Sequence, residues 1–241
     1  MTSLTAGPDG VLLVDKAEGM TSHDVVALLR RKLEIKKIGH CGTLDPIATG
    51  LLLLTIGRGT KIQDLLMSED KSYSGTLTLG ASTSTQDRQG QVVETRPVPE
   101  LSEEQIRAAF EKFRGDFYQM PPMVSAKKQG GIPLYKLARQ GKVVEREPRL
   151  VHVYRYSIDK IALPDIDFSV LCSKGFYVRT YAHDIGEMLG CGAHLKSLRR
   201  TKSGRFDVDL AITVADIKNK PREEISKRIL SLPEVSRMRG A

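Results

Sequence analysis

The sequence predicts an α+β fold built on a mixed, mostly antiparallel central sheet flanked by helices and loops. Segments with the two-residue alternation of strands are interspersed with segments that have the periodicity of amphipathic helices. The two kinds do not follow the regular strand–helix–strand order of a parallel α/β protein. Apolar segments at 151–163 and 166–180 are separated by two turn-forming residues, which is typical of an antiparallel hairpin. The sequence contains no internal repeat.

The N-terminal part is predicted to begin with a buried strand that leads into a turn, GVLLVDKAEGMTS at 10–22. A helix follows over SHDVVALLRRKL, with Ser22 as its N-cap. Its apolar face is predicted to contain Val25, Val26, Leu28, Leu29 and Leu33. The later apolar segment ATGLLLLTIG, at 48–57, has a length that does not decide between helix and strand.

The middle of the chain is predicted to contain two strands and one helix. KSYSGTLTLG at 71–80 alternates as a strand does, with Tyr73 and Leu77 on the same face. The polar segment ASTSTQDRQGQ predicts a loop, and VVE begins the next strand. LSEEQIRAAFEKF at 101–113 predicts a helix that opens with a capping box. The box is Ser102 with Gln105, and the predicted inner face is Ile106, Ala109, Phe110 and Phe113.

Residues 115–150 are irregular and predict an excursion from the core, part loop and part short helix. The hairpin of 151–180 is then expected to turn through Pro164 and Asp165. RTYAHDIGEMLGCG predicts a helix that ends near Gly190, and HLKSLRRTKSG is a basic segment. Two helical pieces, TVADIKNK and REEISKRIL, are predicted close to the C-terminal end of the sequence.

Charge and cysteine content narrow the class of protein. Among 241 residues, Lys and Arg number 37 against 29 Asp and Glu, a net charge of +8. Such an excess is compatible with a polyanionic partner and also with a basic surface that only keeps the protein in solution. The three cysteines lie far apart without a CxxC motif, which argues against a disulfide scaffold and a structural zinc site. We expect a cytoplasmic protein, because no signal peptide or membrane-spanning apolar run is recognised.

A single carboxylate, Asp45, stands in a glycine-rich stretch, GHCGTLDPIATGLL at 39–52. Gly42 and Gly50 lie on either side of it and Pro46 follows it directly. Asp-Pro is a common turn dipeptide, so a turn is the simplest interpretation of these residues alone. The GRGTK stretch at 57–61 does not complete a phosphate-binding P-loop. No second acid is tied to Asp45 in sequence, which disfavours paired-carboxylate hydrolysis.

Aromatic and basic residues gather in three further places. Where one strand is predicted to end, the sequence has a cluster of Lys174, Tyr177 and Arg179. Taken alone, each of these residues is explained as an ordinary exposed or core side chain without a function. Two basic stretches, SAKKQGG and HLKSLRRTKSGRF, favour contact with a phosphate backbone over a merely solvated surface. The candidate contacts are Lys127, Lys128, Lys196, Arg199 and Arg200.

Four stretches together resemble the bacterial tRNA pseudouridine-55 synthases, the B-type pseudouridine synthases. The stretches are KIGHCGTLDPIATGLLLLTIGRGTK, KSYSGTLTLG, PPMVSAKKQGGIPLYKLARQG and SKGFYVRTYAHDIGEMLGCGAHLKSLRRTKSG. The resemblance implies the pseudouridine synthase catalytic fold and isomerisation of one uridine in the T-loop of tRNA, with no cofactor and no metal. The base would be flipped out of its stack.

The resemblance also assigns roles to residues. It makes Asp45 the catalytic carboxylate, as the nucleophile at C1′ or the base that removes a sugar proton. It matches Tyr177 with the tyrosine of the proton step at C5 and Arg179 with the arginine that pairs with the catalytic Asp. The expected substrate-binding residues are His40, Tyr73 and Leu198. Lys16 is expected to support the loop and not the reaction.

The chain departs from the family pattern at several positions. Ser84 and Gln89 stand where the family usually has acids, so that Asp87 remains as the acid of its loop. Ala17 replaces a usual Pro, and Cys41 replaces a Thr or Val and is interpreted as a packing residue. We expect a catalytic domain at 1–216, with an RNA-binding excursion at about 118–150. Residues 217–241 are expected to form a short helical tail without a separate RNA-binding domain.

Three alternatives stay open from the sequence. One is a tRNA-binding or RNA-folding protein with little catalysis. Another is a pseudouridine synthase that acts on another RNA, and a third is a hydrolase that uses Asp45. The expected partner is the T-arm of tRNA, with no membrane and no metal, and the protein is expected to be a monomer.

Overall fold

A computed structural model describes residues 8–123, 128–129, 132–133 and 146–240 of the chain. The chain divides into two compact units. The first comprises Met1–Lys71 and Arg199–Ala241, and the second comprises Ser72–Leu198. Strand β12 (Ala193–Ser203) therefore contributes its first part to the second unit and its last part to the first. The predicted α+β class and the mostly antiparallel sheet are confirmed.

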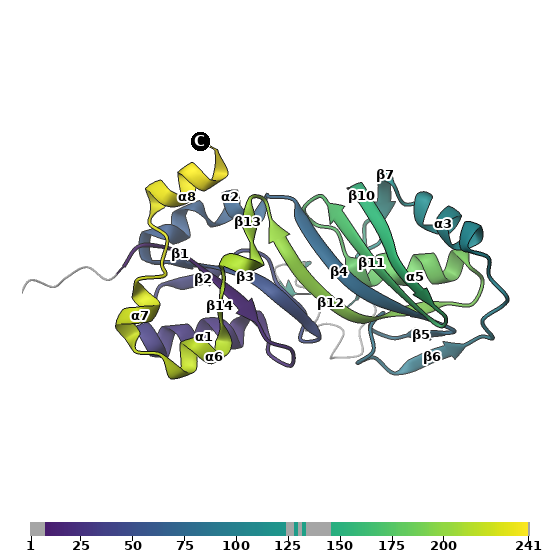
Figure 1. The fold of residues 1–241 in the computed structure, drawn as a ribbon, viewed down its shortest axis with the longest axis horizontal. Helices are drawn as coiled ribbons and strands as arrows, with labels where there is room; N and C mark the ends of the chain where they lie inside the picture. The colour runs from purple at the N-terminus through teal and green to yellow at the C-terminus, as the bar shows by residue number, and fades with distance from the viewer. Residues whose placement is uncertain (1–7, 124–127, 130–131, 134–145, 241) are drawn as a thin grey trace, which may run out of the picture. The chain divides into compact units, whose positions relative to one another are not determined.

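The first unit is built on β1 (Gly10–Lys16) and β3 (Ala48–Ile56), which pair antiparallel from Gly10 opposite Ile56 to Lys16 opposite Gly50 (Figure 1). β14 (Ile212–Thr213) pairs parallel with β1, and β2 (Ile38–His40) pairs antiparallel with β3. β13 (Phe206–Asp207) pairs with the end of β12. Nearly every residue of β3 is buried, as expected for a strand covered on both faces, and this settles the ambiguity of the apolar segment.

Helices of the first unit pack around these strands. They are α1 (Ser22–Leu33), α2 (Gln63–Met67), α6 (Val214–Asn219), α7 (Arg222–Ser226) and α8 (Leu232–Arg239), with 3₁₀ turns η1 (Gly57–Ile62) and η2 (Val208–Leu210). The N-cap of α1 is Thr21, whose side chain forms a capping box with Asp24. The prediction of Ser22 as N-cap is therefore wrong, because Ser22 is buried and its hydroxyl bonds the backbone of Leu44.

The apolar core of the first unit collects side chains from both ends of the chain. It consists of Val11, Leu13, Cys41, Leu51, Leu53, Leu66, Phe206, Val208 and Val235. Burial raises the pKa of Cys41 to about 12, so this thiol packs as a small apolar group, as predicted. Among the described residues, no helix is long and apolar enough to cross a membrane.

The strands of the second unit follow the order β12-β4-β11-β10-β7. They are β4 (Lys71–Leu79), β7 (Gly115–Gln119), β10 (Arg149–Ala162) and β11 (Asp165–Cys172). The predicted hairpin is confirmed, with Ala162 opposite Asp165 at its closed end. Short strands β5 (Ala81–Thr83) and β6 (Val92–Thr95) form a separate hairpin, and β8 (Lys128–Gln129) pairs with β9 (Ile132–Pro133). The predicted loop at 81–91 therefore begins with a strand.

Two helices, α3 (Glu103–Glu111) and α5 (Val178–Met188), belong to the second unit. The capping box of Ser102 and Gln105 is confirmed. The predicted strand at 166–180 ends at Cys172, and a turn with Gly175 at φ +82° leads into α5. Tyr177 and Arg179 therefore lie at the start of a helix. The basic segment at 194–204 forms strand β12 up to Ser203, and its apolar residues Leu195 and Leu198 are buried.

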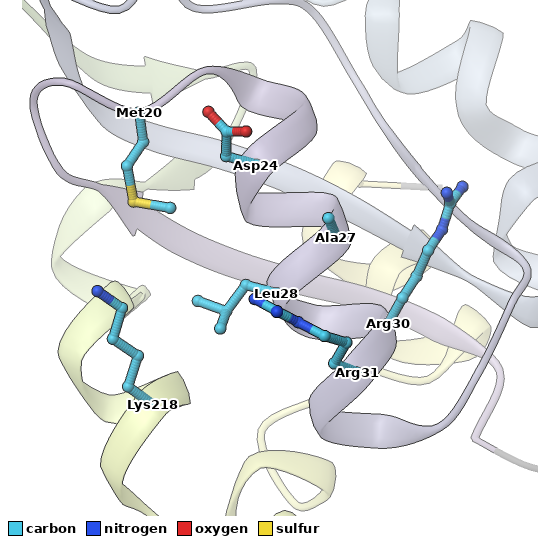
Figure 2. Close-up of a pocket in the computed structure, with 7 residues that line it drawn as sticks. All are labelled: Met20, Asp24, Ala27, Leu28, Arg30, Arg31 and Lys218. Atoms are coloured by element: carbon cyan, nitrogen blue, oxygen red, sulfur yellow. The ribbon is translucent and has the colours of Figure 1, made fainter.

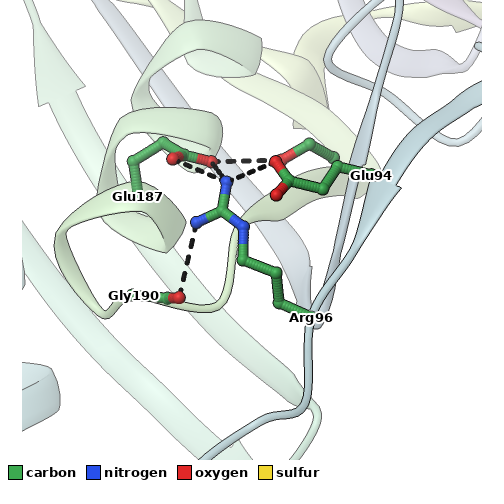
Figure 3. A network of polar contacts seen from close by, with 5 residues as sticks. Glu94, Arg96, Glu187 and Gly190 are labelled. Atoms are coloured by element: carbon green, nitrogen blue, oxygen red, sulfur yellow. Dashed lines mark hydrogen bonds and ion pairs between the residues drawn. The ribbon is translucent and has the colours of Figure 1, made fainter.

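Arg96 ties the β5–β6 hairpin to the C-terminal end of α5 (Figure 3). Its Nη2 donates to Glu187 at 2.9 Å and to Glu94 at 2.7 Å, and its Nη1 donates to the carbonyl oxygen of Gly190 at 3.4 Å. The two carboxylates hold the guanidinium in its charged form. The group is partly exposed, so each ion pair contributes little to stability, while the fork geometry orients the hairpin.

The aromatic core between α3, α5 and the sheet of the second unit contains a buried tyrosine. The ring of Tyr181 packs edge-on or tilted against Phe110, Phe113, Phe168 and Phe176, at centroid distances between 5.3 and 5.9 Å. Its hydroxyl is buried without a hydrogen-bond partner within the described part of the chain. Burial raises the pKa of this phenol, so the hydroxyl stays neutral. Because the hydroxyl makes no hydrogen bond within the described residues, the cost of its desolvation is not compensated.

Tyr181→Phe is expected to leave the free energy of unfolding unchanged or raise it by up to about 1 kcal/mol, because it removes an unpaired buried hydroxyl. Tyr156→Phe is the matched control, since Tyr156 packs on the same Phe110 ring but donates to Glu111 at 2.8 Å. That control should lose about 1 kcal/mol. Urea unfolding of both variants checks this, and equal losses would contradict it.

Candidate active site

The first unit presents Asp45 on a loop between β2 and β3, just before a turn. The side chain is half-buried. Its own carbonyl oxygen accepts from Ala48 N at 3.0 Å, and the carbonyl oxygen of Pro46 accepts from Gly19 N at 2.8 Å. On the other side, the amide N–H of Leu44 donates to Ser22 Oγ at 2.9 Å. The backbone is thus fixed immediately before and after the carboxylate, which gives its side chain a defined origin.

Arg200 braces this loop from within the first unit. The side chain is 1% exposed, with Nε donating to the carbonyl oxygen of Leu51 at 2.7 Å and Nη2 donating to that of Gly42 at 3.2 Å. Gly50 has φ +99°, and a Cβ there would lie 2.3 Å from the carbonyl oxygen of Arg200. Only glycine allows this approach of β3 to β12. Sequence patterns placed Arg200 among the RNA contacts, whereas its burial assigns it to the support of the loop.

Lys16 adds a buried positive charge near Asp45. Its Nζ donates to the carbonyl oxygens of Ala17 at 2.9 Å and Met20 at 2.7 Å, and the residue is fully buried. Burial lowers the pKa of Lys16 to about 8, and the negative charge of Asp45 is the largest opposing influence. The hydrogen bonds of Lys16 hold the turn at 17–20. The N–H of Gly19 in this turn donates to the carbonyl oxygen of Pro46 in the loop of Asp45.

His40 ends β2, half-buried, and meets His23 edge-on with ring centroids 5.3 Å apart. Its Nδ1 is buried without a hydrogen-bond partner within the described residues. Burial lowers the pKa of His40 to about 4, and the neighbouring His23 and Arg200 side chains lower it further. The imidazole is therefore neutral at physiological pH, a state that suits contact with an uncharged ring better than contact with phosphate.

The second unit places Tyr177 and Arg179 at the start of α5. Tyr177 is the N-cap residue and is half-buried. Arg179 is 3% exposed, with Nη1 donating to the carbonyl oxygen of Thr85 at 2.9 Å and Nε lying 3.9 Å from Asp87 Oδ2. The guanidinium is thereby held in place before any ligand arrives.

Asp87 is a neighbour of Arg179. The sequence singled it out only as the acid that remains in its loop. It is 5% exposed, and its Oδ1 accepts from Thr85 Oγ1 at 2.6 Å and from Gln89 N at 3.0 Å. The signal was available in the sequence, because an Asp in a polar turn with Thr two residues earlier is typical of a side chain that bonds its own loop. That it faces Arg179 depends on tertiary structure.

Tyr73 and Leu198 share one face of the sheet in the second unit. Tyr73 lies on β4, half-buried, two residues before Gly75. A Cβ on Gly75 would lie 3.4 Å from Leu198 Cδ1 and 2.7 Å from the carbonyl oxygen of Ser197. Because residues two apart on a strand point to the same side, Leu198 and Tyr73 flank a common surface. Glycine at 75 allows this close approach of Ser197 and Leu198 to β4.

The predicted RNA-backbone contacts have different surroundings. Lys196 forms an ion pair with Asp165, and Arg199 forms a bidentate pair with Asp15 at 2.7 and 3.0 Å. The carboxylate of Asp15 raises the pKa of Arg199 further above its ordinary value. Lys127 lies outside the described residues, and Lys128 belongs to β8. Among the described residues, no group of three or more His, Cys, Asp and Glu side chains could hold a metal ion.

A groove in the first unit, not foreseen from the sequence, runs beside α1 and α6 (Figure 2). Its volume is about 580 Å³, and it is lined by Met20, Asp24, Ala27, Leu28, Arg30, Arg31 and Lys218. Arg30 points away from the groove, and its Nη2 donates to the carbonyl oxygen of Ile38 at 2.7 Å. Arg31 and Lys218 are exposed and extend beside Leu28. The groove thus combines an apolar floor with a cationic rim.

Similarity to known proteins shows the family of the chain. Residues 30–178 match the TruB family pseudouridylate synthase (N terminal domain), and residues 179–233 match the tRNA pseudouridylate synthase B C-terminal domain. The family match and the curated relatives make the chain a pseudouridylate synthase by class. The chain belongs to the TruB family.

Relatives and solved structures extend the similarity over most of the chain. A tRNA pseudouridine synthase B of Opitutus terrae is 55% identical over 222 residues, 92% of each chain. That of Geobacter sulfurreducens is 51% identical, over 87% of this chain and 69% of its own. A Cbf5-Nop10-Gar1 complex matches with a TM-score of 0.73 at 28% identity, covering 95% of this chain and 62% of the matched one. A chain of an H/ACA RNP bound to a substrate RNA containing 2'-deoxyuridine matches with 0.70 at 26%, covering 95% and 61%.

His40→Gln is expected to make stability less sensitive to acid. The folded state keeps this ring neutral down to about pH 4, whereas in the unfolded chain it binds a proton near its ordinary pKa of 6.5. The unfolded state therefore binds more protons as the pH falls through this window, and the folded state loses stability there. The variant should remove up to about 1.4 kcal/mol per pH unit of that slope. Denaturant unfolding between pH 7 and pH 4 measures it.

His23→Gln is the matched control, because His23 contacts the same ring but is exposed. It should leave most of the slope in place. If the slope of the His40 variant equals that of the wild type, the neutral buried state of His40 is disproved.

Proposed function

We propose that this pseudouridine synthase isomerises the T-loop uridine of tRNA, position 55, to pseudouridine. The observation that carries the proposal is the identity of 55% over 92% of the chain with a tRNA pseudouridine synthase B, together with a single braced carboxylate, Asp45, in the matching loop. The reaction conserves all atoms of the substrate. The N1–C1′ bond breaks, the uracil turns, and a C5–C1′ bond forms, while C5 loses a proton and N1 gains one.

Asp45 is the carboxylate that this chemistry requires. It acts as the nucleophile at C1′ or as the base that removes a sugar proton, and either role needs one ionised carboxylate with a fixed origin. Because the product is an isomer of the substrate, the reaction calls for no electron carrier. The anchoring of the backbone on both sides of Asp45 supports the assignment, since small displacements of a reacting group are costly.

The other roles are those that the family resemblance assigns, and the chemistry of the side chains is compatible with them. A flipped uracil needs a flat surface, and Tyr73 supplies one beside the apolar side chain of Leu198. His40, neutral, fills the space that the flipped base leaves. Tyr177 carries the proton step at C5, and Arg179 supplies a fixed positive charge to the site.

We also propose how the remaining parts of the chain are organised. Residues 217–241 serve as a helical tail of the catalytic body at 1–216, because Val235 belongs to the core of the first unit and Leu230 bridges to Val11. The segment at about 118–150 carries RNA contacts, and the enzyme acts as a monomer. All three cysteines are buried free thiols, as suits a protein of the reducing cytoplasm.

Asp45→Asn is expected to lower turnover at least about a thousandfold, because an amide is neither a nucleophile nor a base for this reaction. Binding of tRNA should stay within about tenfold, since phosphate and stacking contacts dominate affinity. Tritium release from an unmodified tRNA transcript, with the product mapped by mass spectrometry, measures both activity and site. Appreciable turnover by the variant would remove Asp45 from catalysis, and wild-type binding without product would favour an RNA-binding protein.

The double variant Arg31→Ala/Lys218→Ala is expected to weaken tRNA binding and its salt dependence. If both cations neutralise phosphates from the groove rim, the slope of log K against log salt should decrease by about 1.4 to 1.8. Arg107→Ala/Lys112→Ala on α3 removes the same charge from another exposed surface and serves as control. Filter binding between 50 and 300 mM KCl measures the slopes, and equal slopes for both double variants would place the groove outside the tRNA surface.

A further inference from the structure

Gln119 ends β7 and is the most completely buried amide side chain of the second unit, at 1% exposure within the described residues. Both ends of its amide contact one residue. Its Oε1 accepts from Tyr177 N at 2.8 Å, and its Nε2 donates to the carbonyl oxygen of Tyr177 at 3.0 Å. This cyclic pair reproduces, with a side chain, the two-bond pairing of opposite residues in an antiparallel ladder.

Tyr177 stands where such support has the greatest effect. It is the N-cap residue of α5, with φ −108° and ψ 106°, and no side chain caps the helix there. The preceding turn, with Lys174 and Gly175, is exposed. On the helical side, the carbonyl oxygen of Tyr177 accepts from Tyr181 N at 3.0 Å. On the other side, Gln119 is the partner of its N–H. The direction of the phenol is therefore set jointly by the helix and by Gln119.

Gln119 itself is held rigidly. Its backbone pairs with Arg149 in the β7–β10 ladder, and its burial leaves the amide no alternative partner in water. The neighbouring residue Thr180 is held separately, with its Oγ1 donating to Gln86 Oε1 at 2.9 Å. Arg179 is held by Thr85. Arg179 and Thr180 thus have side-chain partners other than Gln119, so loss of Gln119 acts on Tyr177 and leaves these two residues anchored.

We propose that Gln119 is a positioning residue that fixes the Tyr177 phenol for the proton step of the isomerisation. The inference rests on the role of Tyr177 in the proposed function. Proton transfer requires donor and acceptor within hydrogen-bond reach, and a displacement of about 1 Å can cost about a hundredfold in rate. A residue that holds the backbone of Tyr177 at both its N–H and its carbonyl oxygen controls that displacement without touching the substrate.

The test is a double-mutant cycle on single-turnover rates, with the full chain in excess over an unmodified tRNA transcript. Gln119→Leu removes both hydrogen bonds at similar volume and should slow conversion about tenfold to a hundredfold, with the Kd for tRNA changed less than about threefold. Combined with Tyr177→Phe, it should add no more than about twofold to the effect of Tyr177→Phe alone, because both changes remove the same function.

Two further variants separate positioning from folding. Gln119→Glu keeps the acceptor for Tyr177 N–H and loses the donor, so its rate should fall between those of the wild type and Gln119→Leu. Ser82→Ala removes another buried hydrogen bond of the second unit, from Ser82 Oγ to Glu187 at 3.2 Å, and should lower thermal stability without changing the single-turnover rate.

A folded Gln119→Leu variant with the wild-type rate would overturn the proposal, and so would a loss that adds fully to that of Tyr177→Phe. If Gln119→Leu does not fold, the same criteria apply to Gln119→Glu. Failure of the proposed function has a different signature, because the wild type would then yield no pseudouridine at the T-loop position in the same assay.

Discussion

The buried guanidinium of Arg200 is the constraint on which the geometry of the first unit depends. A cation at 1% exposure is costly unless its hydrogen bonds are satisfied, and Arg200 satisfies them on the carbonyl oxygens of Leu51 and Gly42. One partner lies on strand β3 and the other opens the loop of Asp45. A displacement of the loop would leave the buried charge without one of its hydrogen-bond partners. The same side chain that bonds strand β3 therefore also fixes the loop of Asp45.

In the second unit, a helix terminus is the element whose side chains are held in place. The first turn of α5 carries Tyr177 and Arg179, and its residues are held by separate side chains and backbone groups, from Gln119 and from the loop that contains Thr85 and Asp87. None of these supports comes from a neighbour in sequence. The cost of burying Arg179 and Asp87 is offset because both side chains make hydrogen bonds in the interior and their opposite charges face each other.

The basic residues fall into two groups, those that are paired or buried inside the protein and those that are exposed to solvent. Arg199 and Lys196 pair with acids, and Arg200 is enclosed. Arg31 and Lys218, which sequence patterns did not single out, stand exposed over an apolar floor. A polyanion meets such exposed cations first, because paired charges must give up a partner before they neutralise a phosphate. An excess of basic residues in a sequence therefore indicates the class of the partner, but it does not identify which basic residues contact that partner.

The sequence by itself determined the fold class, most helices and strands, and the loop that carries Asp45. These features follow from local periodicity, capping residues and glycine positions, which a single segment contains in full. It did not determine that ATGLLLLTIG is a strand, because a short apolar run is equally compatible with a buried helix. It missed the N-cap at Thr21, since Ser22 offers the same chemistry one residue later and only its bond to distant Leu44 decides between them. Tertiary structure alone decided that Arg200 is internal, that Asp87 faces Arg179 and that Gln119 holds Tyr177. Those interactions join residues far apart in the chain, and no local pattern encodes which polar group will be buried against which partner.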